Sequence, residues 1–144
     1  MDEKVLRKYL FKEVELTQKV IDRMGNNSFL VKGAAITLVA ASLLVEGKLY
    51  DSFIALLPWL AFWYLDAYFL RVERLYRRLY YWVTTNRLTS EEFLLDLNRK
   101  SLEKRFGNDV DCVPQTMFSK TLIIFYGLLF IMIVLSIFAK LLLF

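Results

Sequence analysis

A long run without charge near the end of the chain most constrains what this sequence can fold into. Residues 121–139 are 19 consecutive uncharged residues, most of them apolar. As an α-helix this run would be about 28 Å long, which matches one bilayer core. Lys120 and Lys140 stand on either side of it, where their ammonium groups can reach the membrane interface. We therefore predict a membrane-spanning helix over residues 118–141.

Composition extends this prediction to the whole chain. Hydrophobic residues make up 57% of the 144 residues, above the proportion in a typical soluble domain, and charged residues still reach 24%. The charges are segregated from the apolar stretches, which indicates an all-α integral membrane protein with polar segments outside the lipid. The single cysteine, Cys112, excludes an internal disulfide bond and fits a reducing compartment.

Two helices are predicted in the first third of the chain. Residues 1–25 carry apolar residues at helical spacing among charges of both signs. We interpret them as an amphipathic cytoplasmic helix that packs on its neighbours or on another subunit, with a helix lying on lipid as the alternative. Gly25 and the polar residues after it predict a break, and Asn27 or Ser28 can cap the next helix. Residues 28–46 then form the first membrane span.

A face of small residues runs along this first span. Gly33, Thr37 and Ala41 follow one another at intervals of four, so they share one side of a helix. Small residues let membrane helices approach closely, and such packing occurs both within one subunit and between subunits. We therefore predict helix–helix packing at these three residues, and the sequence leaves both kinds open.

The second span, residues 53–70, carries an acidic residue. A short connection over residues 46–52 predicts an antiparallel hairpin with the first span, which would bring Lys32 and Asp66 to a similar depth. We expect them to form a structural ion pair. Proton or ion handling by Asp66, or an interfacial carboxylate with neither role, are the alternatives.

The second span is predicted to continue beyond the lipid as a cytoplasmic helix to residue 84. Charged residues follow on this continuation, and we name them the basic collar: Arg71, Glu73, Arg74, Arg77 and Arg78. Positive-inside topology and contact with anionic lipids explain the arginines best, and Glu73 and Arg77 are spaced to pair. A site for a phosphate-bearing ligand is the alternative. Nucleic acid is not expected, because no recognition motif accompanies the arginines.

A further cytoplasmic helix is predicted over residues 89–107. Thr89 with Glu92 three positions later has the form of a capping box, and Gly107 is suited to the position just after a helix. A loop should then lead to the last span.

The distribution of basic residues predicts the orientation. The first 27 residues hold six Lys and Arg, residues 71–118 hold nine, and the connection between the first two spans holds Lys48 alone. Basic residues favour the cytoplasmic side, so three spans would place the N-terminus in the cytoplasm and the C-terminus outside it, in the periplasm or extracellular space.

The side chains that usually carry catalysis are scarce. The chain has no histidine, which removes the commonest general base and the commonest metal ligand. Its carboxylates do not form metal-ligand or catalytic pairs, and it has no phosphate-binding loop. We therefore expect no enzymatic activity, no metal and no cofactor.

Two stretches resemble a known family. Residues 27–39 (NSFLVKGAAITLV) and residues 62–80 (FWYLDAYFLRVERLYRRLY) are similar to the RipA-like octameric membrane proteins of the bacterial inner membrane. The resemblance covers roughly residues 15–82 and not the last span. It implies a homo-oligomer, an octamer, with a cytoplasmic helical region and no known enzymatic activity. The positions that match its pattern are Lys32, Asp66, Arg71, Glu73, Arg74 and Tyr80.

Two functional hypotheses follow. In the first, the chain is a non-enzymatic inner-membrane protein whose copies build a ring with a cytoplasmic helical collar. In the second, the same ring is a channel-forming or membrane-perturbing effector, gated by an unidentified cytoplasmic ligand or protein. The layout supports this second hypothesis through a looser resemblance to the small two-span effector domains of antiphage defence. An accessory subunit of a larger complex is a third, weaker reading.

Overall fold

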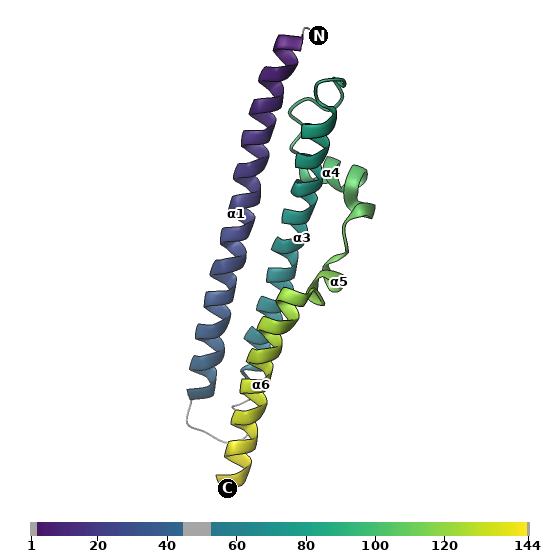
Figure 1. Cartoon of the computed structure of the whole chain (residues 1–144). Coiled ribbons are helices and arrows are strands. Elements are labelled where there is room, and N and C mark those ends of the chain that lie inside the picture. Colours follow the sequence, from purple (N-terminus) through teal and green to yellow (C-terminus); the bar gives the residue numbers. More distant parts are fainter. Residues whose placement is uncertain (1–2, 45–52, 144) are drawn as a thin grey trace. The chain divides into compact units, whose positions relative to one another are not determined.

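The computed structural model describes residues 3–44 and 53–143, and within these ranges the chain is helical and has no β-strand. The elements, shown in Figure 1, are α1 (Glu3–Leu44), α3 (Leu56–Asn86), α4 (Arg99–Phe106), the short 3-10 helix η1 (Gly107–Asp109), α5 (Val113–Met117) and α6 (Lys120–Leu143). The described residues form two compact units. The first unit comprises residues 3–26 and 70–112, and the second comprises residues 27–44, 53–69 and 113–143.

The predicted break at Gly25 is wrong, because α1 is one helix of 42 residues. Gly25 does not adopt a positive φ, and no atom lies within 4 Å of the place that a Cβ would occupy there. A glycine inside a helix costs only about 1 kcal/mol relative to alanine, so the turns on either side carry the helix through. Ser28 caps no helix, and its hydroxyl group donates to Asp66. The predicted end of the first span at residues 45–46 and the connection 46–52 lie outside the described residues.

The core of the first unit lies along one face of α3. Apolar residues recur along this face at helical spacing, and all of them are buried: Val72, Leu75, Tyr76, Leu79 and Val83. Leu102 of α4 is also fully buried, and the hydroxyl group of Tyr76 donates to the backbone carbonyl of Leu97 at 2.8 Å. Burial raises the pKa of the Tyr76 hydroxyl, so this side chain acts as a neutral donor at ordinary pH.

The predicted helix over residues 89–107 is only partly correct. Turns occupy much of its first half, and α4 starts at Arg99 with Asn98 as its N-cap, whose side chain accepts a hydrogen bond from the backbone N–H of Lys100. The capping box does not form, since the hydroxyl group of Thr89 donates to the carbonyl of Asn86. Gly107 has a φ of −60°, so it is not the left-handed residue that was predicted to end the helix.

Three helical segments pack together in the second unit. A small core joins Val39 of α1, Ala55 just before α3 and Ile133 of α6. The indole N–H of Trp59 donates to the carbonyl of Tyr126 at 2.8 Å, which ties α3 to α6. Within this unit α3 runs antiparallel to both α1 and α6 (Figure 1). The antiparallel direction of α1 and α3 agrees with the predicted hairpin.

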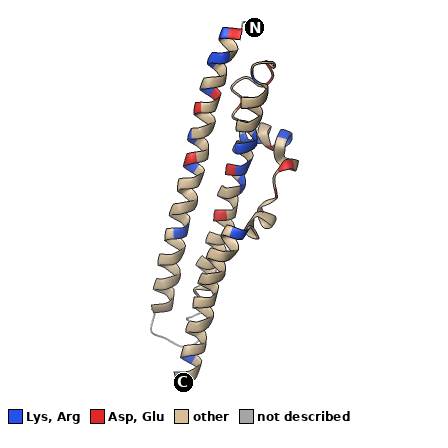
Figure 2. Ribbon diagram, viewed as in Figure 1, with Lys and Arg blue, Asp and Glu red and all other residues tan. Residues whose placement is uncertain are grey.

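Two of the described helices, α1 and α6, are long and apolar enough to cross a membrane by length and composition. Figure 2 shows how few charged residues α6 carries. The apolar half of α3 is not among the candidate spans, and a stretch of spanning length that begins at Leu56 includes Asp66, Arg71 and Glu73. Pro58 lies in the first turn of α3, where proline is tolerated, and the helix continues beyond it to Asn86.

Candidate functional site

A polar cluster in the second unit surrounds the carboxylate of Asp66. The Lys32 ammonium group lies 2.7 Å from Asp66 Oδ2, which confirms the predicted ion pair. The Asp66 side chain is fully buried, whereas that of Lys32 is 22% exposed. Ser28 donates to the other carboxylate oxygen and itself accepts from Lys32 at 2.6 Å. The negative charge is therefore matched by a cation and by hydrogen bonds, as a buried carboxylate requires.

The sequence did not reveal the third partner of Asp66. The hydroxyl group of Tyr126 lies 3.2 Å from Asp66 Oδ2 and 3.1 Å from the carbonyl of Phe62, and it can donate to either. The Tyr126 ring stacks on Trp63, with centroids 5.9 Å apart. A lone tyrosine in an otherwise apolar run was the available signal, because a buried hydroxyl group needs an acceptor. The cluster thus joins α1, α3 and α6.

Of the two kinds of packing that the sequence leaves open for the small residues of α1, packing within the subunit does not occur among the described residues. Gly33, Thr37 and Ala41 are all exposed, and the buried residues of this part of α1 are Val31, Ala35 and Val39. No atom lies within 4 Å of the place that a Cβ would occupy on Gly33. The hydroxyl group of Thr37 donates to the carbonyl of Gly33 at 2.9 Å, within its own helix. The small-residue face is therefore not covered by the described part of the chain.

The basic collar lies in the first unit, and two of its arginines pair with glutamates. Arg77 lies 2.8 Å from Glu73, as predicted from their spacing. Arg71 lies 3.0 Å from Glu103, which fastens α3 to α4. The two carboxylates neutralise part of the positive charge of the collar, so the arginines do not face solvent as a uniform basic surface.

Three arginines of the collar, Arg77 among them, border an open hollow of about 550 Å³. Arg74 lies 2.9 Å from the carboxylate of Asp111, and Arg78 donates to the backbone carbonyl of Asp109 at 3.4 Å. We name this feature the arginine hollow. Its lining residues are Arg74, Arg77, Arg78, Tyr81, Asp109, Val110 and Asp111.

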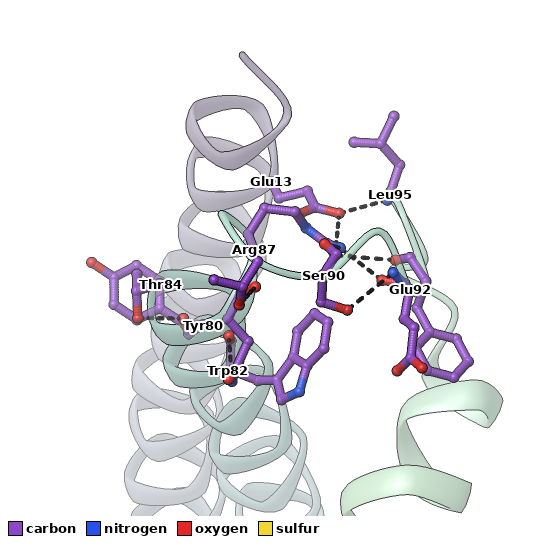
Figure 3. A network of polar contacts seen from close by, with 11 residues as sticks. Glu13, Tyr80, Trp82, Thr84, Arg87, Ser90, Glu92 and Leu95 are labelled. Atoms are coloured by element: carbon purple, nitrogen blue, oxygen red, sulfur yellow. Dashed lines mark hydrogen bonds and ion pairs between the residues drawn. The ribbon is translucent and has the colours of Figure 1, made fainter. Parts of the chain in front are cut away.

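A buried ion pair in the first unit was missed by the sequence analysis (Figure 3). The guanidinium group of Arg87 donates to both carboxylate oxygens of Glu13, at 2.5 Å and 3.0 Å. The two side chains are only 1% and 4% exposed, respectively. Glu13 was hidden among the many charges of an amphipathic helix, and Arg87 among the residues of a turn. An ion pair 74 positions apart leaves no local signal.

The same pair organises the turns that replace the predicted helix. Arg87 also donates to the backbone carbonyls of Ser90 and Glu92, at 3.1 Å and 2.7 Å, and Glu13 accepts from the backbone N–H of Leu95 at 2.6 Å (Figure 3). These partners satisfy backbone groups that a helix would have paired internally. They hold Leu95 at a φ of 55°, in the left-handed region that non-glycine residues rarely adopt.

Aromatic contacts support this arrangement. The guanidinium group of Arg105 lies 3.7 Å from the ring centroid of Phe93 and 4.9 Å from that of Trp82. Arg87 approaches the Trp82 ring to 4.9 Å. Burial lowers the pKa of Arg105 from its ordinary value, although a guanidinium group stays charged at any physiological pH. Phe93, which also has a positive φ of 53°, is therefore held by its ring as well as by its backbone.

No protein family, curated protein or solved structure matches the chain in the comparisons with known proteins. The resemblance to the RipA-like proteins therefore stays a prediction. Within the described ranges, no group of three or more Cys, Asp or Glu side chains could hold a metal ion.

Proposed function

We propose that the chain is a non-enzymatic membrane protein with three spans, which assembles with copies of itself. The helices α1 and α6 supply two candidate spans. The start of α3 is the third span that we propose. The described contacts of Asp66 satisfy its carboxylate, so it does not prevent this part of α3 from lying in lipid. The basic residues then favour a cytoplasmic N-terminus and a C-terminus on the other side.

The observation that carries self-assembly is the exposed small-residue face of α1. A helix that faced lipid alone would gain nothing from small side chains, whereas a helix that meets another helix needs them for close approach. Gly33, Thr37 and Ala41 are not used for packing against the described residues 3–44 and 53–143, and a second copy is the partner that we propose for them. An assembly of eight in the bacterial inner membrane is what the resemblance to the RipA-like family adds, and the arginines of the basic collar favour contact with anionic lipids.

The mass of the detergent-solubilised protein tests this proposal, by multi-angle light scattering or native mass spectrometry. We expect one defined oligomer for the natural sequence. Gly33→Leu should lower its mass, because a large side chain separates the helices. Gly127→Leu is the matched control: it also places leucine on an apolar helix where no atom lies within 4 Å of the new Cβ. A monomeric natural protein, or equal masses for both variants, would contradict the proposed interface.

A second function is favoured by the arginine hollow. An effector that opens the membrane needs a cytoplasmic surface on which a signal can act, and the hollow offers ligand-sized space beside Arg74 and Arg78. In this case the assembled copies form the pore, and an unidentified ligand or protein controls it. Expression in bacteria with a potential-sensitive dye separates the two functions. An effector depolarises the cells once its signal is present, and a structural assembly leaves the membrane potential unchanged.

A further inference from the structure

We infer that the arginine hollow binds an anion that bears a phosphate group. Three of its lining residues are arginines, and Arg74, Arg77 and Arg78 lie at intervals of three and four on α3, so they share one face of the helix. The acidic groups opposite them come from the segment after α4, at Asp109 and Asp111. The hollow therefore brings a cationic helix face and a short acidic segment to one open space.

The contacts that now occupy the arginines are easily exchanged. Arg74 and Asp111 form an ion pair whose side chains are 35% and 60% exposed, and exposed pairs of this kind contribute little to stability. Arg78 is exposed and reaches the carbonyl of Asp109 at 3.4 Å, a long hydrogen bond to a neutral acceptor. An incoming anion would give both guanidinium groups shorter, charge-assisted hydrogen bonds.

The number and kind of cations favour phosphate over carboxylate. A carboxylate offers two oxygens and one negative charge, which suits one arginine. A phosphate group offers more oxygens and up to two charges, so it can bridge neighbouring guanidinium groups on one helix face. The space of about 550 Å³ exceeds what a single phosphate group needs. The remainder of the ligand would lie against Tyr81, whose side chain is exposed at the edge of the hollow.

Two sources could supply this chemistry. Arg77 follows the end of the predicted span at residue 70 by seven positions, about 10 Å along α3, so the headgroup of an anionic phospholipid is one source. A soluble phosphate compound of the cytoplasm is the other. The inference goes beyond self-assembly and does not depend on it, and the soluble source would supply the signal of the effector function.

Thermal unfolding of the full chain in detergent tests binding, with inorganic pyrophosphate as the probe and sodium chloride of equal ionic strength as the reference. A ligand that binds the folded state raises the unfolding midpoint. We expect pyrophosphate to exceed chloride for the natural sequence, and Arg78→Gln to weaken its apparent affinity roughly tenfold or more. Arg77→Gln should act in the same direction.

Arg7→Gln is the control for Arg77→Gln. Both arginines are exposed to a similar extent, and both form a 2.8 Å pair with a glutamate four positions earlier, but Arg7 lies outside the hollow. Equal affinities for pyrophosphate in the two variants would overturn the inference. Light scattering on the same samples distinguishes failure of phosphate binding from failure of self-assembly. A monomer that binds pyrophosphate would contradict self-assembly but not phosphate binding.

The lipid arm uses nanodiscs of phosphatidylcholine, with and without phosphatidylglycerol. If phosphatidylglycerol raises the midpoint and Arg78→Gln removes that gain, the headgroup is the source. If pyrophosphate stabilises the protein in pure phosphatidylcholine and phosphatidylglycerol adds nothing, the source is soluble. The inference fails if neither phosphate compound stabilises the protein more than chloride does.

Discussion

Arg87 and Glu13 are 74 positions apart in the sequence, yet the guanidinium group of one donates to both carboxylate oxygens of the other. The pair is buried in the first unit and joins α1 to the residues that follow α3. A buried bidentate pair gives directional hydrogen bonds as well as charge neutralisation. It therefore fixes where the chain turns after Asn86, a point at which the sequence alone predicted the approach to another helix.

Arg87→Gln should destabilise the protein by about 3–5 kcal/mol, because it leaves the Glu13 carboxylate buried without a cation. Chemical unfolding in detergent, followed by circular dichroism, measures this loss. Arg7→Gln removes a pair that is largely exposed on both sides and should change stability by less than about 1 kcal/mol. Similar losses in the two variants would show that the Arg87 pair contributes no more than a surface pair.

Both charges of the Lys32–Asp66 pair can be removed together, so a double variant should be more stable than a variant that lacks only one of them. Asp66→Leu leaves Lys32 without its carboxylate and should lower both stability and oligomer yield, by about 3–5 kcal/mol for stability. The double variant Lys32→Met with Asp66→Leu removes both charges, and we expect it to recover most of that loss, since apolar side chains can replace a buried pair. The unfolding midpoints of the single and double variants measure the loss and its recovery. A double variant no better than Asp66→Leu contradicts this account, and so does an Asp66→Leu protein that behaves like the natural one.

Gly25→Ala should stabilise the protein by about 0.5–1 kcal/mol. The glycine is in the middle of a helix without a positive φ, and a Cβ meets no atom within 4 Å. Alanine has the better helix propensity and restricts the unfolded chain more. The unfolding midpoint measures the gain. If the chain instead turned at Gly25 with a left-handed backbone, the same substitution would be destabilising.

Asp96 predicts a loss of stability in acid. The hydrogen bond from Ser101, and secondarily that from the backbone N–H of Asn98, lowers the pKa of Asp96 below its ordinary value of 3.8. A carboxylate with a lowered pKa stabilises the folded state above its unfolded pKa, and this contribution disappears as the pH falls through the folded value. Asp96→Asn should therefore lower the unfolding midpoint at pH 7, and the difference should shrink as the pH falls below the ordinary value of 3.8. A difference that is independent of pH would exclude this linkage.

Periodic and local features were predictable from the sequence. The apolar run that forms α6, the buried face of α3 and the Glu73–Arg77 pair all depend on spacing within one helix, which a sequence displays directly. The Lys32–Asp66 pair was predictable because two charges in apolar segments have few other partners. The apolar half of α3 was predicted as a span but is not among the two candidate spans, since its aromatic and charged residues lower its hydropathy.

Features that depend on distant partners were not predictable. The pattern of Thr89 and Glu92 favoured a helix start, but buried Arg87 and Glu13 take up backbone groups of the same segment. Gly25 has a poor helix propensity, yet long helical stretches on both sides outweigh one unfavourable residue. The small-residue face was correctly recognised as one side of a helix, but its spacing does not show which helix packs against it.

The Glu13–Arg87 pair also has a consequence for how such a sequence can change over generations. The carboxylate of Glu13 serves the guanidinium group and the backbone N–H of Leu95 together, so a mutation at position 13 disturbs the partner helix and the turn at once. Neither residue can be lost alone without leaving a buried charge. Homologous proteins that keep this pair should retain both residues or exchange both together. Positions 13 and 87 should therefore covary in an alignment of such proteins.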